Sequence, residues 1–143
     1  MPDPLQFTIP GPPVAQGRGR ATVVAGRAKV YDPKKSRDWK HTVGATALAA
    51  GARPIEGPVV VELTFIFARP VSTYRKKKPR GREPKMSAPD CDNLGKGVCD
   101  ALNGVAYLDD RQVVGLAVTK WVGAQGEPAR TVVVVREWGS GDE

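Results

Sequence analysis

The segment VVVELTFIFA (residues 59–68) gives the strongest strand signal in the chain. β-Branched and aromatic residues dominate it, and prolines at positions 58 and 70 bound it. It therefore predicts a mostly buried strand around which the remaining elements are arranged.

The segments around this strand predict five more strands and two helices. Residues 5–9 alternate apolar and polar side chains, and residues 18–24 and 27–31 predict a hairpin turning at Ala25-Gly26. We expect residues 110–121 and 129–138 to pair with each other through the glycine-rich turn 123–126. A helix is expected from Asp32, as N-cap, to about Ala50, with Trp39, Val43, Ala47 and Ala50 on its apolar face. A second helix is expected over residues 93–103, with Leu94, Val98, Ala101 and Leu102 on its apolar side. The order predicts an α+β fold with a single mixed sheet and two main helices.

The size and composition predict one domain over residues 1–143. No apolar run approaches the roughly 20 residues that cross a bilayer, and the start lacks the order of a secretory signal, so we expect a cytoplasmic protein with no membrane partner. Cys91 and Cys99 do not have metal-site or redox spacing, so we expect both to be reduced, with Cys99 buried. Residues 139–143 are expected to form a frayed tail.

Positive charge is concentrated in one segment of the sequence. The formal net charge is +7, and residues 69–85 hold eight basic residues against one acid. Residues 69–89 contain several prolines and are predicted to form a mobile basic loop. Such a run is often only a solvated loop, but its place directly before an acidic cluster favours phosphate binding. The side chains expected to contact DNA are Arg18, Arg20, Lys29, Arg75, Lys76, Lys77, Lys78 and Arg80.

The acidic cluster consists of DCDNLGK (residues 90–96) and the pair Asp109-Asp110. If the backbone before the helix is extended, Asp90 and Asp92 point the same way and can face one ion. With Asp92 as helix N-cap, Lys96 lies one turn further on, and a tight connection can bring Asp110 in as a third carboxylate. Oxygen donors of this kind suit Mg²⁺ or Mn²⁺, which can activate water for phosphodiester hydrolysis.

Simpler explanations exist for each acidic residue taken singly. Asp92 could merely cap the helix, the Asp109-Asp110 pair could be a turn, and Asp100 could be a solvated residue or an ion-pair partner of Lys96. A calcium-binding loop is excluded because Leu94 and Ala101 stand where ligands belong. The single histidine, His41, is far in sequence from the cluster, which argues against Ser-His or Cys-His catalysis.

Three motifs together resemble the signature of the RusA family of Holliday-junction resolvases: PDCDNLGK (residues 89–96), DALNG (residues 100–104) and LDDRQV (residues 108–113). The resemblance implies a homodimeric, Mg²⁺-dependent endonuclease that nicks four-way DNA junctions symmetrically. It also implies that Asp90, Asp92 and Asp110 are the metal-binding catalytic aspartates and Lys96 the catalytic lysine, with Asp109 in support.

A physical argument also favours a homodimer, because one chain has one carboxylate cluster and symmetrical cutting needs two. The sequence therefore predicts a Mg²⁺-dependent, structure-specific endodeoxyribonuclease of DNA recombination and repair. Two alternatives stay open. One is a nuclease acting on flaps or other branches, and the other is a non-catalytic protein that binds branched DNA through a metal-phosphate clamp.

Overall fold

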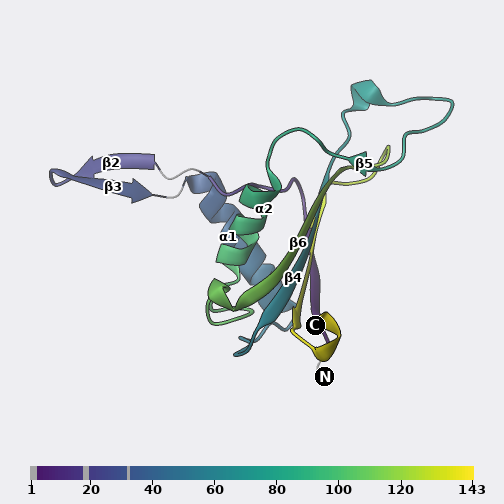
Figure 1. Ribbon diagram of the computed structural model, residues 1–143. Helices are drawn as coiled ribbons and strands as arrows, with labels where there is room; N and C mark the ends of the chain where they lie inside the picture. Colours follow the sequence, from purple (N-terminus) through teal and green to yellow (C-terminus); the bar gives the residue numbers. More distant parts are fainter. Residues whose placement is uncertain (1–2, 18–19, 32) are drawn as a thin grey trace.

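A computed structural model describes residues 3–17, 20–31 and 33–143. A five-stranded sheet with the strand order β1-β7-β4-β6-β5 forms the centre of the molecule (Figure 1). Its strands are β1 (Leu5–Pro10), β4 (Val59–Phe67), β5 (Glu83–Pro84), β6 (Val113–Val122) and β7 (Arg130–Glu137). The pair β4–β6 is parallel and the other pairs are antiparallel. The predicted α+β architecture with one mixed sheet is confirmed.

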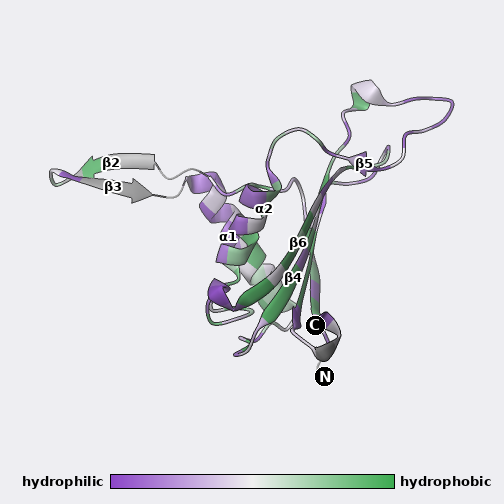
Figure 2. Ribbon diagram, viewed as in Figure 1, coloured by the Kyte–Doolittle hydropathy of each residue, from purple (hydrophilic) through white to green (hydrophobic). Residues whose placement is uncertain are grey.

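Two helices, α1 (Lys34–Ala49) and α2 (Cys91–Ala101), pack together against one face of the sheet (Figure 1). From α1, Trp39, Val43 and Ala47 enter the core as predicted, but Ala50 is exposed because it lies beyond the last helical turn. Figure 2 shows that apolar residues are concentrated on β4 and β6, which these helices adjoin.

Strand β4 supplies the centre of the core. Its alternate residues Val59, Val61, Leu63 and Phe65 are at most 2% exposed and pack with Leu94, Val98 and Leu102 of the α2 segment. Burial of one such side chain contributes about 1.5–3 kcal/mol to folding, so α2 is held chiefly by this face. Ile66, on the opposite side of β4, is also buried, at 1% exposure.

The predicted pairing of β6 with β7 is wrong, because β4 lies between them. β4 aligns parallel to β6 and antiparallel to β7. A strand with buried residues on both faces is best placed inside a sheet, where both of its edges are hydrogen-bonded. The turn after β6 therefore passes over the end of β4 instead of closing a hairpin.

Three predicted element boundaries also need correction. Helix α2 begins at Cys91 with Asp90 as N-cap, not at residue 93 with Asp92 as cap. Residues 110–112 form a short 3-10 helix, η2 (Asp110–Gln112), and β6 starts only at Val113. Pro33 occupies the N-cap position of α1, and the predicted cap Asp32 lies outside the described residues.

The predicted hairpin is confirmed and consists of β2 (Arg20–Val24) and β3 (Arg27–Tyr31). Ala25 and Gly26 have φ angles of 52° and 77° at its turn, which suits a two-residue hairpin connection. The hairpin extends away from the main sheet (Figure 1).

The segment between β4 and α2 projects in another direction (Figure 1) and contains η1 (Val71–Thr73) and β5. We expected this segment to bury little, yet Arg69 is only 7% exposed. Its guanidinium donates to the carbonyls of Gly123 and Gly81, both at 3.0 Å, and pairs with Glu83 at 2.5 Å. These bonds fasten the base of the loop to the β6–β7 turn, while the mobility of the whole loop stays a prediction.

The tail makes hydrogen bonds to β7, while its predicted fraying stays a prediction. Residues Ser140–Asp142 form a 3-10 turn, η3, and Asp142 accepts two hydrogen bonds of 2.8 Å from the Arg136 guanidinium. Both cysteines are free, and Cys99 is buried as expected. No helix in the described part of the chain is long and apolar enough to span a membrane.

The hydrogen-bonded carboxylate of Glu127, in the turn between β6 and β7, gives a stability prediction. Hydrogen bonds from Arg82, the Ala124 amide and Arg130 lower the pKa of Glu127 to about 2. Glu127 therefore stabilises the fold fully above its ordinary pKa of 4.5, and this contribution is lost as the pH falls toward 2. We expect Glu127→Gln to lower the urea midpoint at pH 7, with the difference from wild type shrinking between pH 4.5 and pH 2. Glu56→Gln, at an exposed position, is the control; a difference that stays constant across this pH range would contradict the prediction.

Candidate active site

One face of α2 carries the polar residues of the candidate site. Asp92, Gly95, Lys96 and Cys99 follow helical spacing, and together with Asp110, Val113 and Leu116 they line a pocket of about 330 Å³. Gly95 lets α2 approach β6, since a Cβ there would lie 3.2 Å from Val118 Cγ2. The pocket thus lies between the outer face of α2 and the start of β6.

A lysine of β6 holds in place the segment that leads into α2. The Lys120 ammonium donates to the carbonyls of Ser87 and Pro89, at 2.8 and 2.9 Å, just before Asp90. Asp90 itself has an extended backbone, but the next residues are helical. Because Asp92 already lies in the first helical turn, the extended geometry from which a common direction of Asp90 and Asp92 was expected does not apply to this pair. Asp90 is exposed and is not among the residues that line the pocket.

Asp109 and Gln112 hold η2 in place through a reciprocal cap. Asp109 Oδ1 accepts from the Arg111 amide at 2.9 Å, and Gln112 Oε1 accepts from the Asp109 amide at 2.9 Å. Gln112 Nε2 also donates to the Ile55 and Gly57 carbonyls, at 2.6 and 2.8 Å. The hydrogen bond from the Arg111 amide is the main cause of the lowered pKa of Asp109. Asp109 therefore caps a turn, as one of the simpler explanations proposed, and leaves Asp110 at the pocket.

Asp100 is a member of this acidic group that the sequence analysis did not assign to it. Its carboxylate lies near enough to Asp110 for that residue to raise its pKa, and it forms a salt bridge of 3.8 Å with Lys40 of α1. Burial raises the pKa of Asp100, Lys40 opposes this rise, and Asp110 adds to it. A solvated residue or an ion-pair partner of Lys96 was expected here, and Lys96 contributes only a weaker attraction than Lys40. The sequence signal was available, since Asp92, Lys96 and Asp100 follow each other at intervals of four on one helix.

The carboxylates of the candidate site do not converge at one point within the chain. Asp92 lies in the first turn of α2 and Asp100 near its end, and eight residues of helix span roughly 12 Å. Since Asp110 lies beside Asp100, it is at the far end of α2 from Asp90 and Asp92. Among residues 3–17, 20–31 and 33–143, no three His, Cys, Asp or Glu side chains are grouped closely enough to hold a metal ion.

The cysteine beside the pocket is not suited to nucleophilic chemistry. Burial raises the pKa of Cys99 to about 11, so its thiol is neutral at ordinary pH. Its carbonyl accepts a 2.6 Å hydrogen bond from the hydroxyl of Tyr107, which is fully buried. This bond joins Tyr107 to a residue of α2 that lines the pocket.

Comparison with known proteins identifies the family. The family model described as "Endodeoxyribonuclease RusA" matches residues 10–136, which is most of the chain. The chain belongs to the RusA family. It is also 38% identical over 143 residues to the uncharacterized protein YqaN of Bacillus subtilis (strain 168), and this match covers 94% of the chain and 97% of that protein.

Membership of the RusA family places the chain among endodeoxyribonucleases, which are hydrolases of DNA. The three motifs that suggested the family all lie inside the matched region. The pocket between α2 and β6 is formed by the second half of that region.

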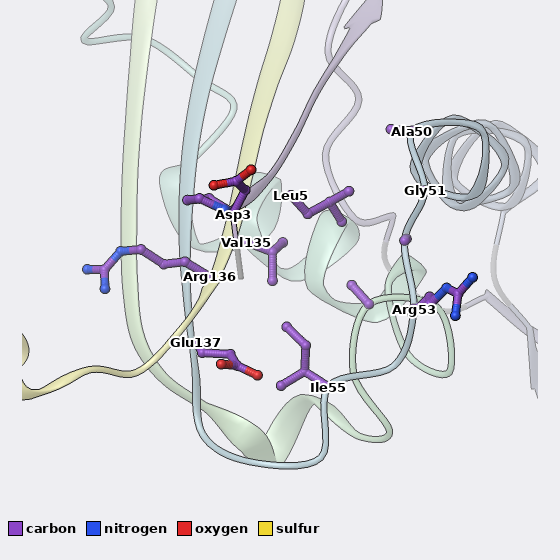
Figure 3. Close-up of a pocket in the computed structure, with 12 residues that line it drawn as sticks. Asp3, Leu5, Ala50, Gly51, Arg53, Ile55, Val135, Arg136 and Glu137 are labelled. Carbon is purple, nitrogen blue, oxygen red and sulfur yellow. The ribbon is translucent and has the colours of Figure 1, made fainter. Parts of the chain in front are cut away.

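A second pocket, of about 300 Å³, shares no lining residue with the first. Figure 3 shows Leu5, Ile55 and Val135 around its middle and the guanidinium groups of Arg53 and Arg136 directed outward. Since its polar groups do not converge, it offers no comparable chemistry.

The basic residues expected to contact DNA divide into two groups in the structure. Arg75, Lys76, Lys77 and Lys78 are exposed, whereas Arg80 Nε donates to the Thr73 carbonyl at 2.9 Å and the Arg80 guanidinium lies 3.8 Å from Glu83. Arg20 lies on β2 and Lys29 on β3 of the hairpin, and Arg18 lies outside the described residues.

The proximity of the Asp100 and Asp110 carboxylates can be tested without an activity assay. In Asp110→Asn we expect the pKa of Asp100 to fall relative to wild type, because a neighbouring negative charge is removed. In Lys40→Met we expect it to rise, because the opposing cation is lost. Carboxyl ¹³C NMR titration in metal-free buffer measures both values. An Asp100 pKa that is unaffected by either change would mean that the acidic group is not assembled as described.

Proposed function

We propose that this RusA-family protein is a Mg²⁺-dependent, structure-specific endodeoxyribonuclease. It resolves Holliday junctions by paired symmetric nicks and acts in DNA recombination and repair in the cytoplasm. The observation that carries the proposal is a pocket lined by Asp92 and Lys96 of α2 and by Asp110 of η2, in a chain of the RusA family. Acidic and basic side chains gathered in this way suit the hydrolysis of a phosphodiester.

The donor set fits a hard cation. Asp90, Asp92 and Asp110 offer only carboxylate oxygens, and Mg²⁺ or Mn²⁺ prefers such donors together with water and substrate phosphate. A bound ion would supply an activated water and stabilise the leaving oxygen. Lys96 lines the pocket together with Asp92 and Asp110, and its charge can offset negative charge that develops on the phosphate.

We propose that a two-fold homodimer completes this donor set. Within one chain Asp110 lies at the opposite end of α2 from Asp90 and Asp92, so the three cannot share an ion as they stand. Two chains facing each other antiparallel along α2 would place Asp90 and Asp92 of one chain against the partner subunit's Asp110. Each dimer would then hold two sites related by the two-fold axis, as two opposed nicks require.

Exposed apolar residues beside the pocket support this dimer. β5 pairs with only Trp121 and Val122 of β6, so most of the outer edge of β6 has no partner strand in the described part of the chain. Val114 and Leu116, on this strand, are 56% and 51% exposed, and Leu108 is 60% exposed. Large apolar side chains grouped at a strand edge are typical of an interaction surface.

The first test is cleavage of an immobile four-way junction with Mg²⁺ and with EDTA. We expect paired nicks only with Mg²⁺, no detectable cutting by Asp92→Asn or Asp110→Asn, and a loss of about 10²-fold in Lys96→Ala. Asp38→Asn, an exposed substitution on α1, should cut like wild type. Cutting by the aspartate variants at the wild-type rate would contradict the assignment of the site.

A second test uses mixed dimers with two different affinity tags. If the site is shared between chains, a dimer of Asp92→Asn with Asp110→Asn keeps one intact site and nicks at about half the wild-type rate. A dimer of wild type with the double variant Asp92→Asn/Asp110→Asn then keeps none. If each chain holds its own site, the two results are reversed, and the shared site is disproved.

A second candidate function is a non-catalytic clamp on branched DNA. The separation of the carboxylates within one chain favours it, since an incomplete site can bind phosphate through an ion without cutting. Junction binding that depends on Mg²⁺ but never produces nicks, in a preparation shown to be dimeric, would support the clamp over the nuclease.

A further inference from the structure

The exposed lysines of the basic loop lie on a short segment whose two ends are fastened by one side chain. Lys76, Lys77 and Lys78 stand between Arg75 and Arg80 and are all exposed. Gln125, in the turn between β6 and β7, reaches both ends of this segment. We define residues 75–80 as the basic finger.

Gln125 makes four hydrogen bonds to the ends of the basic finger. Its Oε1 accepts from the amides of Arg75 and Arg80, both at 2.7 Å, and its Nε2 donates to the Arg75 carbonyl at 3.1 Å. Its own amide donates to the Arg80 carbonyl at 3.0 Å. One uncharged residue, distant in sequence, therefore closes the finger at its base.

Neighbouring contacts reinforce this base. The Gly126 amide donates to the Tyr74 hydroxyl at 2.9 Å, and Arg80 Nε donates to the Thr73 carbonyl at 2.9 Å. The buried Arg69 bonds the Gly123 and Gly81 carbonyls below it. The finger thus stands on a hydrogen-bonded base that joins the loop to the β6–β7 turn.

The basic residues at the base of the finger form salt bridges, whereas the lysines at its tip form none within the described part of the chain. Arg69, Arg80 and Arg82 pair with Glu83 or Glu127 at the base. No salt bridge joins Arg75, Lys76, Lys77 or Lys78 to an acid within the described residues. Glu83 and Glu127 are therefore taken up by arginines of the base, whereas the three lysines of the finger are left to pair with an external anion.

We propose that Gln125 is a positioning residue that holds the basic finger in the conformation that binds DNA phosphates. A closed base lowers the conformational entropy that the lysines lose on binding, and preorganisation of this kind increases affinity without adding a contact. This inference rests on the proposed function, since it takes DNA as the partner. Gln125 acts through the backbone of residues 75 and 80 and touches no DNA itself.

Binding of an immobile four-way junction, measured by fluorescence anisotropy in EDTA over a series of KCl concentrations, tests the inference. In Gln125→Ala and Gln125→Met we expect the Kd to rise about fivefold, because the loop must be ordered on binding. The slope of log Kd against log salt should stay at the wild-type value, because every cation is still present. Replacing Lys76, Lys77 and Lys78 together with alanine should instead reduce that slope by roughly 2 to 3.

Two further measurements separate positioning from loss of fold. Trypsin should cut after residues 75–77 faster in Gln125→Ala than in wild type, while the thermal midpoint stays unchanged, because the cut lies in an exposed loop. In cleavage assays with Mg²⁺, KM should rise with kcat unchanged. Gln6→Ala, an exposed substitution on β1, is the matched control and should match wild type throughout.

The outcomes are distinct. A wild-type Kd in both Gln125 variants, or a salt slope reduced as in the lysine variant, would overturn the positioning role while leaving the nuclease proposal intact. If wild type itself neither binds nor cuts the junction, the proposed function fails, and the inference, which depends on it, fails too.

Discussion

The burial of β4 on both faces is the constraint on which the rest of the structure depends. Val59, Val61, Leu63 and Phe65 pack against the helices, and Ile66 is covered on the other side. Such a strand cannot lie at an edge, so β6 and β7 take places on either side of it. Because β6 then lies next to α2, the polar face of α2 and the start of β6 form one pocket.

The same arrangement separates the two ends of the acidic group. α2 and β6 run in opposite directions beside each other (Figure 1), so the start of α2, which contains Asp92, is far from the start of β6, which follows Asp110. Within one chain, Asp110 instead meets Asp100, whose charge is countered by Lys40. In the proposed dimer, a site shared between two chains would make catalysis depend on assembly.

The basic residues follow a comparable division of roles. Several arginines of the loop form salt bridges with Glu83 and Glu127 at its base, and these salt bridges hold the loop against the β6–β7 turn. The lysines at the tip have no such partners among the described residues and remain available to an external anion. The number of basic residues in the sequence therefore exceeds the number that are free of salt bridges and could bind DNA. The sequence also does not show which contacts hold those free residues in place.

From the sequence alone, the motifs around Asp90, Lys96 and Asp110 already identified the family, because their order and spacing are local properties of the chain. The strand at residues 59–67 and the Ala25-Gly26 turn were likewise predicted correctly, because the burial pattern of a strand and the conformation of a turn depend on residues that are close in sequence. Only the tertiary structure decided that β4 separates β6 from β7, that Asp100 joins Asp110, and that Gln125 closes the basic finger. These contacts join residues far apart in sequence, and their energies depend on which surfaces the packing of β4 brings together.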